Sequence, residues 1–189
     1  MLSLPRGASH KHKKAVYRIL RAKKWLCHER RRTPRPRVHG RVFLAGSSNE
    51  RWAIDVTHID CGSDGWGHLA AVTLCHDREI GGYEFSLRGR AKEAEGASEG
   101  ACPSRFGTLR PQGRVPVVRS DNGLIFQSRR FRPALRDYRL SQEFSTSYTP
   151  EQNGIIERFF RSIREECAWQ HNFGSLAEAQ QAVNRWIEH

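Results

Sequence analysis

The stretch "VVRSDNGLIFQS", residues 117–128, places an aspartate directly after a short apolar run. Asn122-Gly123 between two apolar runs is typical of a hairpin, and Asp is a common neighbour in such turns. On this interpretation, Asp121 only helps the chain to reverse its direction. The alternative is that Asp121 lies at the carboxyl end of a buried strand, where α/β folds place their functional groups. The stretch alone leaves both interpretations open.

Outward from this stretch, the sequence predicts five strands. The segment "RWAIDVTHIDC" (51–61) alternates apolar and polar residues with the period of a strand. Runs bounded by turn residues predict further strands over 68–75, 80–87, 115–120 and 142–146. Three consecutive strands, followed by alternating helices and strands, favour a mixed sheet that is antiparallel first and parallel later. The expected fold class is therefore α/β, and the layout resembles a ribonuclease-H-like five-stranded mixed sheet flanked by helices.

The helices differ in how strongly the sequence predicts them. They are expected over 89–103, over 128–138, after Gly154 and after Ser175. The first is weak because Gly96, Gly100 and Pro103 interrupt it, and each interior Gly costs about 1 kcal/mol relative to Ala. We therefore expect a broken helix that weakens the core. The last helix begins with the capping box Ser175-x-x-Glu178.

Positive charge is concentrated at the N-terminus. Residues 1–41 hold 14 Lys and Arg against the single acid Glu29, a balance of +13, whereas the remainder of the chain carries about −1. Such an arm suits a polyanion, because each cation near a phosphate releases condensed counterions. A solubilising tail and a membrane-surface segment are the alternatives. We predict a basic DNA-binding arm over 1–41 and a folded core over 42–189.

Within the arm, two segments are distinct. The spacing of apolar residues among cations over 11–27 predicts a short basic amphipathic helix. Prolines at 34 and 36 then keep the chain extended. The candidate DNA contacts in this stretch are Arg30, Arg31, Arg32, Arg35 and Arg37.

Several classes of protein are not favoured. No apolar run approaches the ~20 residues of a transmembrane helix, and the N-terminus lacks the apolar region of a secretory signal. The five cysteines are scattered without a CxxC pair, which is typical of reduced thiols rather than a disulfide framework or a zinc site. We expect a cytoplasmic protein without a membrane partner.

Three carboxylates are candidates for chemistry. Asp55 interrupts a strand, where Asp is uncommon, although a charge on an edge strand would explain it equally. Glu157 borders the apolar face of the helix after Gly154, although a solvated ion pair with Arg161 is an alternative. In the expected sheet the first and fourth strands are neighbours and this helix packs beside them. Asp55, Asp121 and Glu157 would then converge.

Convergence would require a counter-charge. Carboxylates about 4 Å apart repel one another by several kcal/mol at an effective dielectric near 20. Oxygen-only ligands select hard Mg²⁺ or Mn²⁺ over zinc. Two such ions can activate one oxygen and stabilise another at a phosphodiester.

Five segments carry a joint pattern: "RWAIDVTHI", "HDREIGGYEF", "VVRSDNGLIFQS", "YTPEQNGIIERFFRSIREEC" and "SLAEAQQAVNRWIEH". This pattern resembles bacterial insertion-sequence transposases of the DDE recombinase type, whose catalytic core is shared with retroviral integrases. The 35 residues between Asp121 and Glu157 match the spacing of this group, as does a basic residue seven positions after the Glu, here Arg164.

The resemblance implies an integrase-like core that binds two Mg²⁺ (or Mn²⁺) through Asp55, Asp121 and Glu157. It implies that hydrolysis exposes a 3′-OH at an element end and that this hydroxyl then attacks another phosphodiester, without a covalent enzyme–DNA link. Arg161, Arg164 and Asn153 are the implied DNA contacts of the core.

The implied partners are double-stranded DNA, as element ends and target, and further copies of the chain; the implied location is the nucleoid of a bacterial cytoplasm. The arm resembles a helix-turn-helix remnant, and the end at His189 suggests a core truncated at its C-terminus. The alternatives are a catalytically inactive DNA-binding remnant, and a structure-selective nuclease that cleaves without joining.

Overall fold

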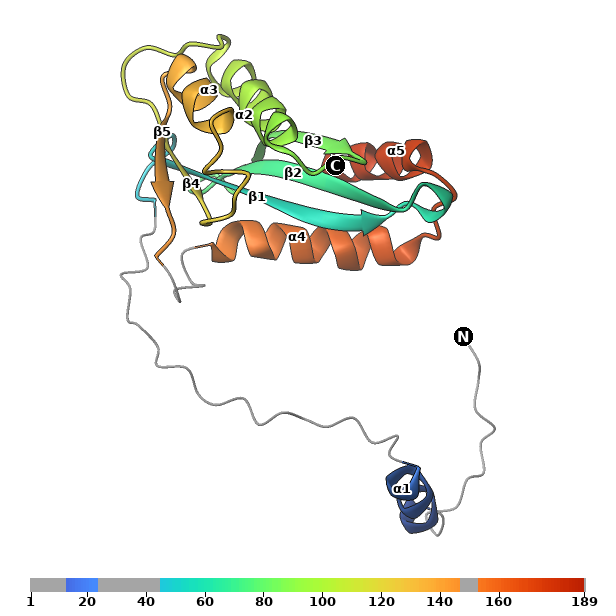
Figure 1. The fold of residues 1–189 in the computed structure, drawn as a ribbon. Helices are drawn as coiled ribbons and strands as arrows, with labels where there is room; N and C mark the ends of the chain where they lie inside the picture. Colours follow the sequence, from blue (N-terminus) through green and yellow to red (C-terminus); the bar gives the residue numbers. More distant parts are fainter. Residues whose placement is uncertain (1–12, 24–44, 147–152, 189) are drawn as a thin grey trace. The chain divides into compact units, whose positions relative to one another are not determined.

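The structure, a computed structural model, describes residues 13–23, 45–146 and 153–188 (Figure 1). The chain divides into two compact units, residues 1–36 and 37–189. In the first unit, α1 (Lys13–Ala22) is a basic helix on which Val16, Tyr17 and Ile19 are each more than half exposed. The amphipathic helix expected over 11–27 is therefore present in its central part.

The second unit is built on a five-stranded mixed sheet. Its strands are β1 (Arg51–Asp60), β2 (Trp66–Leu74), β3 (Ile80–Ser86), β4 (Val117–Ser120) and β5 (Ser141–Phe144). They lie in the order β3-β2-β1-β4-β5. The β1–β2 and β2–β3 pairs are antiparallel, whereas β4 runs parallel to both β1 and β5. This arrangement confirms the expected ribonuclease-H-like sheet.

The parallel pairing of β4 with β5 rules out the hairpin at Asn122-Gly123. Parallel neighbours cannot be joined by a tight turn, because the chain must cross back over the sheet before the second strand begins. Here it crosses through α3 (Phe131–Asp137). The hairpin interpretation of the opening stretch is therefore wrong, although Asn122 and Gly123 do lie in a turn that follows β4.

Helices cover both faces of the sheet. In Figure 1, α2 (Ala91–Phe106) and α3 lie above the sheet, and α4 (Gly154–Glu166) lies below it. One apolar core joins α2 and α3 to Trp52, Ile54 and Val72 of the sheet. The other core joins α4 and α5 (Leu176–Ile187) to the opposite face, including Ala53 and Ala71. Short 3₁₀ turns, η2 (Gly62–Asp64) and η4 (Ala168–Gln170), lie in the connections.

The helix expected to be broken is continuous. α2 runs for 16 residues through Gly96, Gly100 and Pro103, which corrects the prediction. Its backbone approaches β3 closely, since a Cβ placed on Gly82 of β3 would lie 2.3 Å from the backbone oxygen of Ala97. Packing therefore overrides the weak intrinsic helix propensity of this segment.

Gly100 tests this account, because it lies on the exposed side of α2 and a Cβ added there would meet no atom within 4 Å. We expect Gly100→Ala to raise the free energy of unfolding by up to about 1 kcal/mol, since Ala loses less backbone entropy than Gly in a helix. Urea denaturation of the two proteins measures the change. A lower midpoint for Gly100→Ala would contradict this account of α2.

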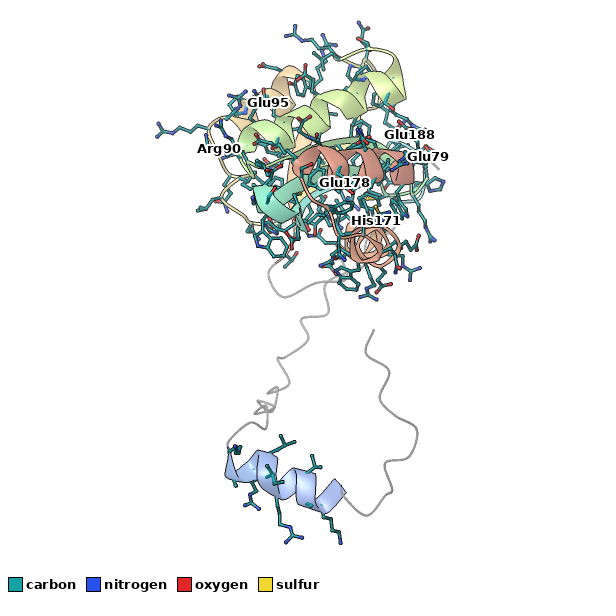
Figure 2. All side chains as sticks on the ribbon, turned by 90° about the vertical axis from the view of Figure 1, so that its right-hand side faces the viewer. Glu79, Arg90, Glu95, His171, Glu178 and Glu188 are labelled. Atoms are coloured by element: carbon teal, nitrogen blue, oxygen red, sulfur yellow. The ribbon has the colours of Figure 1, made fainter. Side chains whose placement is uncertain are left out.

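The capping residues expected at the start of α5 are observed. Ser175 Oγ accepts the Glu178 backbone N–H at 3.4 Å. The carboxylate of Glu178, labelled in Figure 2, accepts the backbone N–H of Gly174 at 2.8 Å. These contacts satisfy N–H groups that the helix itself cannot pair.

Candidate active site

Asp55 and Asp121 occupy matching positions on two neighbouring parallel strands. Ala53 of β1 pairs with Arg119 of β4, so a step of two residues along each strand leads to Asp55 and Asp121. Asp121 follows directly after the end of β4. Neighbouring strands lie about 4.8 Å apart, which makes the two aspartates close neighbours. Asp55 belongs to the central strand of the sheet, so the edge-strand explanation for it is wrong.

α4 brings the third carboxylate to the same face. Side chains two residues apart on a strand point to the same face of the sheet, so Asp55 lies on the same face as Ala53. On that face, Ala53 packs in one core with Ile156 of α4. Ile156 is fully buried, and Glu157 is exposed in the first turn of α4. No ion pair joins Glu157 to Arg161, although the structure describes both residues.

The electrostatics of Asp55 show that the three carboxylates interact. The pKa of Asp55 is raised from 3.8 to about 6, chiefly because burial removes water from the carboxylate. A hydrogen bond from the Val56 N–H, at 2.8 Å, lowers this pKa. The negative charges of Asp121 and Glu157 both raise it. The three acids therefore share one electrostatic environment.

Asp121 also holds the turn that follows β4. Its Oδ1 accepts the Gly123 N–H at 2.8 Å, and a Cβ on Gly123 would lie 2.8 Å from that same oxygen. The Asn122 side chain donates to the Ser145 carbonyl at 3.0 Å, which ties the turn to the end of β5. Any larger residue at position 123 would displace the Asp121 carboxylate.

A partly buried ionic cluster beside the aspartates was not predicted. Arg51 of β1 and Arg119 of β4 both bind Glu143 of β5, with N–O distances of 3.1 and 2.8 Å. The Arg119 side chain is only 3% exposed. The cluster joins the three strands just N-terminal to Asp55 and Asp121. Sequence offered one signal for it: Arg119 and Asp121 are two residues apart and so share a face.

The three acids have the type of oxygen ligands that a hard divalent cation prefers. All three supply carboxylate oxygens, the donors that Mg²⁺ and Mn²⁺ prefer. No Lys, Arg or His among the described residues forms an ion pair with Asp55, Asp121 or Glu157, so their negative charge is not neutralised in that part of the chain. The side chains as placed do not converge: within the described ranges, no three His, Cys, Asp or Glu side chains are arranged to hold one ion.

The predicted DNA contacts of the core lie on or beside α4, whereas those of the arm lie outside the described residues. Arg161 is exposed on α4, and Arg164 is half-buried, with its Nε donating to the Phe160 carbonyl at 2.9 Å. Asn153 caps α4, and its backbone carbonyl accepts the Glu157 N–H at 3.0 Å. The five predicted contacts of the arm, Arg30, Arg31, Arg32, Arg35 and Arg37, lie outside the described residues.

Among the helices that the structure describes, none combines the length and apolar character needed to cross a bilayer.

Comparison with known proteins identifies relatives of the core. The profile described as "Integrase core domain" matches residues 46–150, and a second profile of that description matches residues 138–189. The chain is 30% identical over 146 residues to the transposase InsF for insertion sequence IS3A of Escherichia coli, covering 77% of this chain and 49% of that protein. It is 28% identical over 154 residues to the transposase for insertion sequence element IS904 of Lactococcus lactis, covering 82% of this chain and 58% of the relative.

Solved structures share the fold. The catalytic core domain of BIV integrase matches with a TM-score of 0.52 at 16% identity, covering 71% of this chain and 80% of that one. A chain of the simian T-cell lymphotropic virus intasome matches with a TM-score of 0.58 at 20% identity, covering 78% of this chain and 51% of that one. The chain spans about half the length of the curated relatives just described. With a family profile that covers more than half of its residues and transposases among its relatives, this chain belongs to the integrase core domain family.

Proposed function

We propose that the chain is a DNA transposase that hydrolyses and transfers phosphodiester bonds with the help of divalent cations. The observation that carries this proposal is that acids from three elements act on one group: Asp121 at the end of β4 and Glu157 on α4 both add to the rise that burial causes in the pKa of Asp55 on β1. Its relatives are transposases of insertion sequences, which support double-stranded DNA as the substrate and a bacterial cell as the setting.

In the proposed reaction Asp55, Asp121 and Glu157 would hold Mg²⁺ or Mn²⁺, two ions per site. Ions bound there would activate the attacking oxygen and stabilise the leaving oxygen of the phosphodiester. The Gly123 N–H, which binds one Asp121 oxygen, fixes the orientation of that carboxylate. The Arg51–Glu143–Arg119 cluster joins the three strands just N-terminal to the reacting groups and helps to hold them in register.

The proposal assigns DNA contacts to both units. Arg161 and Arg164 follow Glu157 along α4 by one and two turns, and Asn153 lies at the start of that helix, so a phosphate backbone could run beside them. The arm supplies the balance of +13 over residues 1–41, which suits sequence-independent DNA binding. A structural neighbour of the core is part of an intasome, and we extend assembly of several copies on DNA to this chain.

A matched pair of glutamates on α4 tests the catalytic assignment. Glu157 lies in the first turn, beside the aspartates, whereas Glu165 is exposed in the last turn of the same helix. We expect Glu157→Gln to reduce nicking and joining of a linear duplex carrying the element ends about 10²-fold in Mg²⁺, because several kcal/mol of charge stabilisation depends on the ligands. Glu165→Gln should retain wild-type activity.

The products discriminate between the functions. Nicked and joined duplex that disappears in EDTA supports transposition, whereas nicking without joining supports a nuclease on the same fold. Full activity of Glu157→Gln would refute the assignment. The second candidate, a DNA-binding remnant without catalysis, is favoured by the charge of the arm and by the carboxylates that do not converge in the described ranges. It predicts salt-sensitive duplex binding with no product in Mg²⁺.

A further inference from the structure

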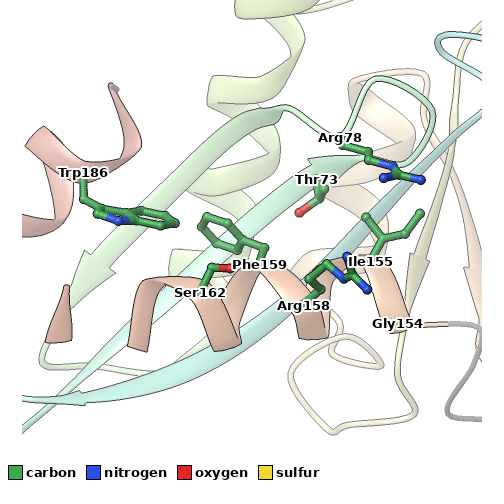
Figure 3. A pocket seen from close by; sticks show the side chains of 8 residues that line it. All are labelled: Thr73, Arg78, Gly154, Ile155, Arg158, Phe159, Ser162 and Trp186. Atoms are coloured by element: carbon green, nitrogen blue, oxygen red, sulfur yellow. The ribbon is translucent and has the colours of Figure 1, made fainter. Parts of the chain in front are cut away.

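A cavity of about 430 Å³ lies on the flank of α4 away from Glu157. It is bounded by the end of β2, the turn that follows β2, α4 from Gly154 to Ser162 and the end of α5 (Figure 3). We call it the Thr73 cavity. The side chains that matter to its chemistry are those of Thr73, Arg78, Arg158, Phe159, Ser162 and Trp186.

The floor of the cavity carries a polar group without a partner. Thr73 is 1% exposed, and within the described part of the chain its Oγ1 makes no hydrogen bond. Figure 3 shows this oxygen turned away from β2 and into the cavity. A buried hydroxyl left unpaired costs about 1–3 kcal/mol, a cost that a ligand offering a hydrogen bond would remove.

One end of the cavity is cationic. Arg78 lies in the turn after β2, where its backbone adopts a φ of 63° and its N–H donates to the Leu74 carbonyl at 2.7 Å. Arg158 projects from α4 at the same end, close to Ile155 (Figure 3). Both arginines are exposed, and neither forms an ion pair with any acid that the structure describes. The first turn of α4 adds the positive end of a helix dipole. This end is suited to a phosphate.

The other end is aromatic. The rings of Phe159 and Trp186 lie 6.0 Å apart, at an interplanar angle of 47°. Figure 3 shows them side by side at the end opposite Arg78, with Ser162 below Phe159. Aromatic faces bind nucleobases by stacking, irrespective of the base. The cavity therefore offers, in sequence, cations, hydroxyl groups and a stacking surface.

We propose that the Thr73 cavity binds one unpaired nucleotide of the DNA strand. Its phosphate lies between Arg78 and Arg158, its sugar or base edge hydrogen-bonds to Thr73 Oγ1, and its base lies against Phe159 and Trp186. This inference rests on the proposed function, because that function brings a DNA strand to α4. Thr73 pairs with Ala53 of β1, two residues before Asp55. α4 lines the cavity with Ile155, Arg158, Phe159 and Ser162 and not with Glu157, so the cavity and Glu157 lie on different flanks of that helix.

Photo-crosslinking tests the proposal on the full chain. The probe is a duplex with a single-stranded overhang that carries 5-iodouracil, irradiated with the protein in EDTA so that no cleavage occurs. We expect an adduct on the peptide containing Phe159 or Trp186. Thr73→Val, which keeps the shape of the side chain, and Arg78→Ala/Arg158→Ala should each lower the adduct yield about tenfold, as expected for loss of hydrogen bonds worth ~1.5 kcal/mol. Arg136→Ala, an exposed arginine of α3 across the sheet, should leave the yield unchanged.

Each other outcome overturns a defined claim. An adduct confined to other peptides, or a full yield from Thr73→Val, overturns the nucleotide site. Competition by a deoxynucleoside 5′-monophosphate as strong as that of the overhang would make the cavity a site for a free nucleotide instead, and also overturns it. A wild-type protein that cleaves duplex in Mg²⁺ but gives no adduct at Phe159 or Trp186 overturns this inference alone. One that gives the adduct but never cleaves overturns only the proposed function.

Discussion

Replacing Asp55 with Asn is expected to abolish strand cleavage and, in the metal-free protein, to raise stability. The negative charges of both Asp121 and Glu157 act on the pKa of Asp55. Its loss removes a ligand and weakens the field that attracts the cations. We expect activity in Mg²⁺ to fall about 10³-fold or more, corresponding to several kcal/mol of lost charge stabilisation.

The stability effect has the opposite sign. The folded-state pKa of Asp55 is about 6 and the ordinary value is 3.8, so between these values the folded chain binds more protons than the unfolded chain. Stability without metal therefore falls as the pH rises from about 4 to about 6, and stays lowered at pH 7. A shift of about two pKa units, discounted for partial exposure, corresponds to about 2 kcal/mol. Asn keeps the acceptor for the Val56 N–H and loses the charge.

Thermal unfolding in EDTA, compared at pH 4 and pH 7, measures this effect. Asp55→Asn should be more stable than the wild type at pH 7, and the difference should vanish near pH 4. Mn²⁺ should stabilise the wild type and have little effect on the variant, because binding to the folded state alone shifts the equilibrium. Asp60→Asn, at the exposed end of the same strand, is the control and should change neither activity nor stability. A destabilised Asp55→Asn at pH 7 would show that the ionised Asp55 carboxylate does not carry the cost of burial and repulsion that raises its pKa.

Replacing Gly82 with Ala is expected to lower the free energy of unfolding by about 3 kcal/mol. A Cβ at this position of β3 would lie 2.3 Å from the Ala97 carbonyl oxygen and 2.6 Å from the Ala101 nitrogen. Both atoms belong to the backbone of α2, which cannot move without opening the core that it shares with the sheet. Overpacking of this kind costs about 1–3 kcal/mol and occasionally more.

Gly81→Ala is the matched control for Gly82→Ala. A Cβ on Gly81 would meet the end of the Leu74 side chain at 2.5 Å and the Cβ of Ala101 at 3.3 Å. Because the Leu74 side chain can rotate away, we expect a smaller loss than for Gly82→Ala. Urea midpoints measured at equal m-values compare the two variants. Equal losses of stability in the two variants would show that the close approach of α2 to β3 does not depend on Gly82.

The sheet was predictable because its signals are local. The alternation around Asp55, the turn residues between the first strands and the later helices give the strand count, and the direction of pairing follows from the lengths of the connections. α2 was underestimated because a contact that stabilises it involves a different segment: the backbone at Ala97 and Ala101 packs closely against Gly82 of β3. Intrinsic propensity cannot report a contact between distant elements.

The candidate site was predictable to a similar extent. The three acids were proposed from their positions at a strand, a strand end and a helix border, and the structure places Asp55 and Asp121 at matching positions on neighbouring strands. The sequence did not reveal that they would fail to converge on one point among the described residues, because side-chain rotamers depend on packing. The Arg51–Glu143–Arg119 cluster was missed since its members meet only after β1, β4 and β5 are aligned. The Thr73 cavity likewise depends on how α4 and α5 pack on the sheet.

The strand order has a consequence for synthesis of the protein. β1, β2 and β3 leave the ribosome before β4, so the antiparallel half can form first while one side of β1 still lacks its neighbour. An open strand of this kind can capture another nascent chain, and charged side chains discourage such pairing. Arg51 and Asp55 lie on that strand. The Asp55 carboxylate, proposed above as a metal ligand, would thus also discourage the growing polypeptide from pairing with other nascent chains on the same messenger RNA.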